Sequence, residues 1–226
     1  MNVALNQGLP PAETAGERAY RRIRADIVFG TLAPGQKLRL DSLKESYGVS
    51  ISTLRELLNR LTSEGLIVAE GARGFEVSPV SPENFREIAN LRQLLECHAM
   101  QQSFALGDME WEGQVVAAHH KLSSIEKRVL AGDRDKVEMW KQYDWQFHQA
   151  LISACGSRVL MDTHGSVFDK YLRYQMLTLK NRGEISAREH RMMLDCALKR
   201  DADTCCKILT AHIEGGVAHA LATGAI

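Results

Sequence analysis

The segment that most constrains the fold is residues 37–65, KLRLDSLKESYGVSISTLRELLNRLTSEG. Apolar residues recur at helical spacing over residues 40–47, and Gly48 follows where a sharp turn needs a positive φ. Ser50 is a good N-cap for a second helix. On that helix four leucines fall at i, i+3, i+4 and i+7 and form an inward stripe: Leu54, Leu57, Leu58 and Leu61. The segment therefore predicts two short packed helices joined at one glycine, either a helix-turn-helix or a plain pair in an all-α domain.

The opposite face of the second helix carries residues that could read DNA. The recognition helix of a helix-turn-helix meets base edges near its own start. The candidates at that position are Ser50, Ile51, Ser52, Thr53, Arg55 and Asn59.

A small β-hairpin is predicted directly after these helices. Residues 66–69 and 74–77 are short, partly β-branched apolar runs, and residues 70–73 join them. Two helices and such a hairpin make a winged helix, whose wing can contact a phosphate or the minor groove. Arg73 and Gly74 are the candidate contacts on the wing.

Charge and composition limit the kind of protein. The chain has 28 basic and 28 acidic residues, which argues against binding nucleic acid by bulk charge alone. Residues 15–60 nevertheless hold a basic excess that suits phosphate contact, although a solvated helix face would explain part of it. No apolar run has the roughly 18 residues that a membrane helix requires, so no membrane partner is expected. No signal peptide is evident, and five cysteines without a CxxC pair fit a reducing cytoplasm.

The order of predicted elements indicates two domains after a loose arm at residues 1–14. A first helix at residues 17–29 belongs with the winged helix, which ends at residue 78. Residues 79–82 are a proline-bearing linker, with Ser81 as N-cap and Pro82 at the first helical position. An all-α antiparallel bundle over residues 83–223 follows, with helices at 82–106, 109–130, 136–154, 158–179, 185–199 and 201–222. The fold class is thus mainly α.

Four side chains of the bundle could hold a metal ion. Asp144 and His148 lie four residues apart on one helix, so both point to the same side, and an aspartate among apolar neighbours needs a partner. His190 and His212 lie on inward faces of the last two helices. One carboxylate and three imidazoles suit a divalent ion such as zinc, nickel or manganese. Ordinary polar histidines remain the alternative, and they are the better interpretation for the other five.

Two stretches resemble a known family. PGQKLRLDSLKESYGVSISTLRELLNRLTSEGLI followed by RGFEV resembles the winged helix of GntR-type bacterial transcription regulators. DWQFHQALISACGSRVL and EHRMMLDCALKRDADTCCKILTAHI resemble the ligand-binding FCD domain of one GntR subfamily. This resemblance implies a metal at the four positions above, beside a pocket for a small carboxylate. Many relatives have arginine where this chain has Ile51, so a different operator is expected, and Ser157 replaces a frequent asparagine.

Two arginines are candidates for holding that carboxylate, because a guanidinium can bind it through two hydrogen bonds. Arg92 lies in LRQLLEC, which is similar to a segment that the family uses at its pocket, and Arg173 is the second candidate. A surface salt bridge is the alternative for either one.

The favoured function is a cytoplasmic, metabolite-responsive transcription regulator, not an enzyme, that acts as a homodimer on double-stranded operator DNA. A repressor is the expected type. The rival hypothesis is a metal-dependent helical enzyme, in which the same four residues would activate water and Glu189 would be the nearest base. A plain protein-interaction module leaves the winged-helix pattern unexplained.

Overall fold

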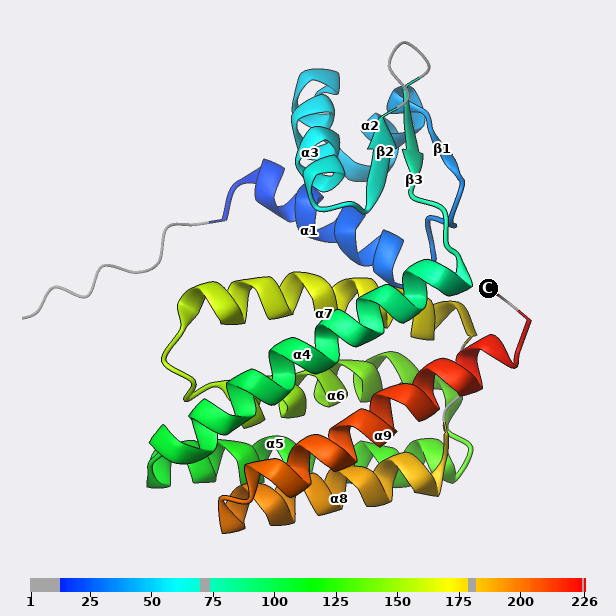
Figure 1. The fold of residues 1–226 in the computed structure, drawn as a ribbon. Helices are drawn as coiled ribbons and strands as arrows, with labels where there is room; N and C mark the ends of the chain where they lie inside the picture. Colours follow the sequence, from blue (N-terminus) through cyan, green and yellow to red (C-terminus); the bar gives the residue numbers. More distant parts are fainter. Residues whose placement is uncertain (1–12, 70–73, 179–181, 225) are drawn as a thin grey trace, which may run out of the picture. The chain divides into compact units, whose positions relative to one another are not determined.

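The structure is a computed structural model that describes residues 13–69, 74–178, 182–224 and 226. The chain divides into two compact units, one ending at Ser78 and the other running from Pro79 to Ile226 together with residues 28–31. Figure 1 shows the elements of each unit in chain order.

The first unit contains three helices and three short strands. The helices are α1 (Ala15–Val28), α2 (Leu40–Tyr47) and α3 (Ile51–Ser63), and the strands are β1 (Lys37–Leu38), β2 (Ile67–Ala69) and β3 (Phe75–Val77). The four leucines of the predicted stripe on α3 are buried, and they pack with Ile23 of α1 in one core. The predicted pair of helices is therefore confirmed.

The turn between α2 and α3 forms as its residues predict. Gly48 has φ 69°, and its amide donates to the Lys44 carbonyl at 3.0 Å, which ends α2. Ser50 then caps α3, because its Oγ accepts a hydrogen bond from the Thr53 amide at 3.1 Å. A left-handed glycine followed two residues later by a capping serine sets the angle between the two helices.

The sheet has one strand more than the sequence pattern predicts. β2 and β3 pair antiparallel, with Ile67 opposite Val77, so the predicted hairpin is confirmed. β1 pairs with the other edge of β3 and gives the order β1-β3-β2. Two residues are too few to show alternation, so the sequence pattern predicts this segment only as the start of the helix-turn-helix. Residues 70–73 lie outside the described part of the chain.

The second unit is a bundle of long helices. They are α4 (Pro82–Leu106), α5 (Met109–Leu130), α6 (Val137–Ile152), α7 (Arg158–Thr178), α8 (Glu184–Lys199) and α9 (Ala202–Leu221). A 3-10 turn, Arg134–Lys136, precedes α6. Ser81 caps α4 through the Asn84 amide, with Pro82 in the first turn, as predicted. The predicted ends of all six helices lie within two residues of the observed ends.

The core of this unit lies between the helices and surrounds a polar centre. α4 packs against α6, α7 and α9, α5 packs against α6 and α8, and α8 packs against α9. Phe85, Phe147, Leu151 and Leu209 are fully buried in it. Each such side chain contributes about 1.5–3 kcal/mol on burial. None of the described helices is long and apolar enough to cross a membrane.

Candidate metal centre and DNA-reading helix

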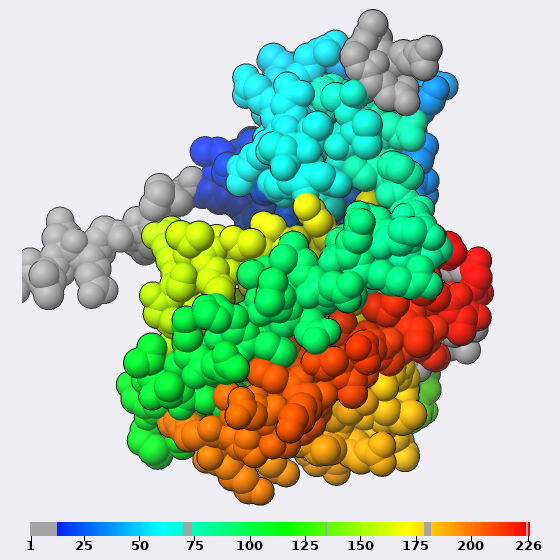
Figure 2. Space-filling view, viewed as in Figure 1, coloured from blue at the N-terminus to red at the C-terminus, as the bar shows by residue number. Residues whose placement is uncertain are grey.

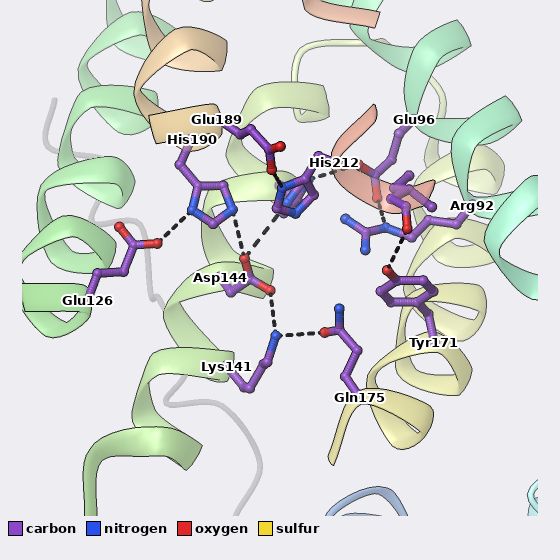
Figure 3. Close-up of polar contacts among 12 residues, drawn as sticks. Arg92, Glu96, Glu126, Lys141, Asp144, Tyr171, Gln175, Glu189, His190 and His212 are labelled. Carbon is purple, nitrogen blue, oxygen red and sulfur yellow. Dashed lines mark hydrogen bonds and ion pairs between the residues drawn. The ribbon is translucent and has the colours of Figure 1, made fainter. Parts of the chain in front are cut away.

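Four candidate metal ligands from three helices meet in the bundle core. Asp144 and His148 come from α6, His190 from α8 and His212 from α9, and all four are buried. Each offers one ligand atom, and these atoms all lie within 4.8 Å of one another. The structure therefore brings together all four residues that the sequence analysis selected. Figure 3 shows Asp144, His190 and His212 around this point.

Each histidine of the cluster is hydrogen-bonded to a glutamate through the ring nitrogen that faces away from the cluster. The Nδ1 atoms of the rings lie 2.9, 2.7 and 2.8 Å from carboxylate oxygens, in the pairs His148–Glu96, His190–Glu126 and His212–Glu189. In a neutral ring, an Nδ1–H bonded to a carboxylate leaves Nε2 as the lone-pair nitrogen that faces the cluster. Glutamates in this position fix the ring orientation and raise the basicity of a metal ligand.

Several ligand atoms that point into the cluster form no hydrogen bond with the described part of the protein. This is the observation that fits a bound cation. Asp144 Oδ1, His148 Nε2 and His190 Nε2 are buried without a hydrogen bond to any described residue. Asp144 Oδ1 lies 3.1 Å from His190 Nε2, close enough for an ion pair but without hydrogen-bond geometry. Buried polar atoms left this way are costly, whereas a metal would bind all of them at once. Among the described residues, three nitrogens and one oxygen form a donor set for zinc, nickel or manganese.

The charges around the cluster shift its pKa values strongly. Burial alone would raise the pKa of Asp144, but Lys141 and His190 hold that pKa well below its ordinary value. Burial lowers the pKa of His148, and it lowers the pKa of His212 to about 3, so both rings are neutral at pH 7. For His190, burial is outweighed by the two carboxylates beside it, which raise the pKa to about 9.

A second buried hydrogen-bond network, centred on Glu96 of α4, adjoins the cluster. Glu96, fully buried, accepts from Arg92 Nε at 2.6 Å and from His148. His164 of α7 bonds the same carboxylate at 2.7 Å, so the structure gives this histidine a carboxylate partner that helical spacing alone did not predict. Burial would raise the pKa of Glu96, but Arg92 and the two rings hold it well below its ordinary range. Glu96 is therefore a charged anchor for His148.

A small cavity adjoins the cluster. Lys141, Asp144, Gln175, Arg182 and His212 are among the residues that line it. Lys141 Nζ lies 3.6 Å from Asp144 Oδ2 and donates to Gln175 at 2.7 Å. The cavity volume is about 20 Å³, close to what one water molecule needs. A metabolite could enter only if side chains or helices moved apart.

The two arginines proposed for a carboxylate ligand occupy other positions. Arg92 is buried, lies over the rings of Phe168 and Tyr171, and does not line the small cavity. Its Nη2 atom, however, has no hydrogen bond among the described residues. Arg173 is buried as well and does not line the cavity either.

A larger cavity of about 590 Å³ lies between α5 and α8, with Arg188 and Arg191 at its edge. It reaches Glu126 but none of the four candidate ligands.

The DNA-reading candidates lie at the start of α3. Ile51 is 36% exposed, Arg55 and Asn59 are also exposed, and all three lie on the side away from the leucine stripe. Arg55 forms no ion pair with a carboxylate in the described part of the chain, so it is available to a ligand. Ser52 is exposed, whereas Thr53 is half-buried, and the Ser50 Oγ that caps the helix lies 2.7 and 2.9 Å from their hydroxyls. Gly74 is half-buried, and Arg73 lies outside the described residues.

The glutamates that support the cluster could not be predicted from the sequence pattern. Glu96 and Glu126 lie 52 and 64 positions from the rings they bond, so no local spacing links the pairs. Lys141 could have been found, because it precedes Asp144 by one helical turn. Glu189 was considered as a catalytic base, but its carboxylate bonds His212 and accepts two hydrogen bonds from Arg182. That leaves little capacity for taking a proton from water.

Comparisons with known proteins agree with this architecture. Residues 15–77 match the family described as "Bacterial regulatory proteins, gntR family", and residues 87–215 match the FCD domain. The chain is 39% identical over 203 residues to the uncharacterized HTH-type transcriptional regulator BphR of Paraburkholderia xenovorans, covering 89% of this chain and 83% of that protein. It is 27% identical to the HTH-type transcriptional repressor GlaR of Escherichia coli, over 86% and 90% of the two chains.

A solved structure supports the same fold. Escherichia coli McbR/YncC superposes with a TM-score of 0.76 at 18% identity, and the match covers 93% of this chain and 98% of that one. Together with the two family matches, it accounts for both units. The chain belongs to the GntR family of bacterial transcription regulators and carries an FCD domain behind its winged helix.

Proposed function

We propose that this protein is a metal-containing repressor that responds to a small organic acid. In this proposal residues 15–78 bind DNA, residues 79–82 are a linker, and residues 83–223 bind the metal and the effector. The observation that carries the proposal is the buried set of four ligand atoms within 4.8 Å, with a glutamate behind each histidine. The name of GlaR as a repressor supports the direction of regulation.

The metal would be held by Asp144, His148, His190 and His212. Once bound, it supplies a Lewis-acid centre that can keep positions open for an oxygen ligand. The protein's own part is to orient the rings through Glu96, Glu126 and Glu189 and to keep the site dry. Zinc, nickel and manganese all fit a set of three imidazoles and one carboxylate.

The effector would be an anion, because the cavity beside the cluster offers cations. Lys141 and Arg182 line it, and Gln175 adds an amide. Arg92 could contribute its free Nη2 atom from the other side of the buried network. A carboxylate that displaced Lys141 from Asp144 would exchange one ion pair for another at little electrostatic cost. Arg173 has less support, since it does not line the cavity.

Effector binding would be linked to DNA binding through a change in helix packing. A cavity the size of one water must enlarge before an organic acid can enter. The acid shifts the bundle only by its differential affinity for the two arrangements. In a homodimer, repacking of the two bundles would change the spacing of two recognition helices on an inverted repeat.

The metal part of the proposal is tested by elemental analysis of purified protein and of His148→Ala and His190→Ala. Both variants should lose the bound metal. His98→Ala is the matched control, because His98 is exposed on α4. Full metal content in both variants would reduce the cluster to structural histidines.

The effector part is tested by a thermal-shift screen against small organic acids, with and without chelator. A true effector should raise the unfolding midpoint, since a ligand that binds only the folded state stabilises it. The rise should shrink in Lys141→Met. An acid that stabilises parent and Lys141→Met equally, with or without metal, would refute the site.

The operator part is tested by binding selections with the parent and with Ile51→Arg. An isoleucine at the start of α3 can make only apolar contact, for instance with a thymine methyl, whereas arginine can bond guanine. The two proteins should select different sites. Identical selected sites would show that Ile51 does not meet the bases.

A further inference from the structure

Two cysteines from distant parts of the chain face each other across α4 and α9. Cys97 Sγ lies 3.9 Å from the Cys206 carbonyl oxygen, and Cys206 Sγ lies 3.6 Å from the Cys97 carbonyl oxygen. Each thiol thus lies over the backbone of the other residue. The two helices pack directly, and Figures 1 and 2 show them side by side on one face, α4 in green and α9 in orange to red.

The two thiols shift each other's pKa in opposite directions. Contact with the Cys97 thiol lowers the pKa of Cys206, while the same contact raises the pKa of Cys97. The thiolate is the reactive form of cysteine, so once either of these thiols is oxidised the other lies close enough to react with it. Both side chains are half-buried, unlike Cys205, which is fully buried.

A surface groove makes the Cys97 thiol accessible to a small oxidant. A groove of about 480 Å³ runs along α4, and Cys97 lines it together with Leu94 and His98. Hydrogen peroxide is small enough to reach a half-buried thiol from such a groove.

We propose that Cys97 and Cys206 form a reversible disulfide in response to a hydroperoxide. The thiolate of one cysteine attacks one peroxide oxygen, the O–O bond breaks, and protonation releases one water and leaves a sulfenic acid on that cysteine. The thiol of the other cysteine then attacks that sulfur and releases a second water. One hydrogen peroxide is reduced to two waters while two thiols are oxidised to one disulfide, and a thiol reductant reverses the change.

The position of the bond gives it a consequence for regulation. Cys97 directly follows Glu96, the anchor of His148, and Cys206 lies on the helix that carries His212. A disulfide would tie these two helices together beside the cluster. Any opening of the bundle that separates α4 from α9 would then be blocked until the bond is reduced.

The test uses the whole chain in the presence of a chelator, which prevents metal-catalysed thiol oxidation. The protein is treated with hydrogen peroxide, free thiols are alkylated, and tryptic peptides are analysed without reduction. Residues 93–121 contain Cys97, and residues 201–207 contain both Cys205 and Cys206. Because these last two share a peptide, Cys205→Ala and Cys206→Ala are matched variants that identify the partner.

The expected result is a cross-link between the two peptides in the parent and in Cys205→Ala, its loss in Cys206→Ala, and its reversal by dithiothreitol. The oxidised parent should also unfold at a higher temperature than the reduced parent, with no such rise in Cys206→Ala. Three outcomes would overturn the proposal: full alkylation of both thiols after peroxide, a cross-link from residues 201–207 to the Cys196 peptide, or a cross-link between two chains.

Discussion

Glu126 offers the sharpest test of the metal centre, because it touches only one ring of the cluster. Its carboxylate lies 2.7 Å from His190 Nδ1, and both side chains are buried. Glu126→Gln keeps an oxygen that can accept the Nδ1–H bond but removes the charge. Glu126→Leu removes the acceptor as well. We expect both variants to bind metal more weakly, the leucine variant more so.

Two opposing effects set the size of the loss. Outer partners of metal-binding histidines typically contribute about 10–100-fold to metal affinity, or roughly 1.4–2.7 kcal/mol. However, Glu126 also helps to raise the pKa of His190 to about 9, so at pH 7 a metal must displace a proton from that ring. Two pH units below the pKa, this costs about 2.7 kcal/mol, which removal of Glu126 would partly relieve.

The sign of the pH dependence follows from these two effects. In the parent, metal affinity should rise about tenfold per pH unit from pH 7 to 9, because the competing proton is lost as the pH approaches the pKa of His190. In Glu126→Leu that slope should flatten. The variant's deficit should therefore be small at pH 7 and reach about 10–100-fold near pH 9, where only the lost orientation of the ring remains.

The assay is competition for zinc against a chelator of known affinity at pH 7 and pH 9, with the chelator keeping the metal in solution. Glu184→Gln is the control, since it makes the same charge change at an exposed position of α8. It should match the parent at both pH values. If Glu126→Leu held zinc as tightly as the parent at pH 9, the glutamate would have no role in orienting His190.

Three further predictions concern the winged helix. Arg55→Ala should weaken specific DNA binding by about 1–3 kcal/mol at equal salt, measured against a scrambled site. Gly48→Ala should destabilise the protein by about 1–2 kcal/mol in thermal unfolding, because φ 69° strains any residue with a Cβ. The cost is one of backbone conformation, since nothing lies within 4 Å of the added Cβ. Gly113→Ala, inside α5, is the control and should not destabilise the protein. Burial and the hydrogen bond to Glu64 raise the pKa of Tyr20 to about 12. The stabilisation that goes with this raised pKa is fully present below pH 10 and is lost as the pH rises through 12. The free energy of unfolding should therefore fall less over this range in Tyr20→Phe than in the parent.

Local signals explain why much of the fold could be predicted. Gly48 and Ser50 each act within four residues of their own position, and the sequence contains all that is needed to interpret them. The same holds for Ser81 and Pro82 at the start of α4. Asp144 and His148 share a face because four residues make about one helical turn. Where the physics is local, the expected and observed elements agree within two residues.

Features that depend on how helices pack could not be predicted from spacing. Glu126 and His190 meet only because α5 packs against α8 in one register. The pairing of β1 with β3 likewise depends on residues 37 and 76 lying opposite each other. Arg173 shows the limit of spacing in another way. Its position predicts that it faces inward, and it is buried, yet it does not line the cavity beside the cluster.

The charges of the buried centre predict that metal and organic acid bind cooperatively. Without metal, the buried centre holds four acidic groups and four basic groups: Glu96, Glu126, Asp144 and Glu189, and Arg92, Lys141, Arg182 and His190. Carboxylates raise the pKa of His190 to about 9, whereas burial lowers the pKa of Lys141 against the opposing effect of Asp144. A divalent ion adds two positive charges and displaces one proton from His190, so the centre gains one positive charge when the metal binds.

An uncompensated charge in a buried site is costly, and a carboxylate in the cavity would neutralise it. Because coupling between two ligands is reciprocal, each should raise the affinity for the other, by roughly 5–150-fold for typical couplings of about 1–3 kcal/mol. Zinc titrations with and without an acid identified by thermal shift measure this directly. In Lys141→Met the centre loses one positive charge, so the metal alone should bind more tightly and the acid should add less. Equal zinc affinity with and without the acid in the parent would show that the two ligands do not share the site.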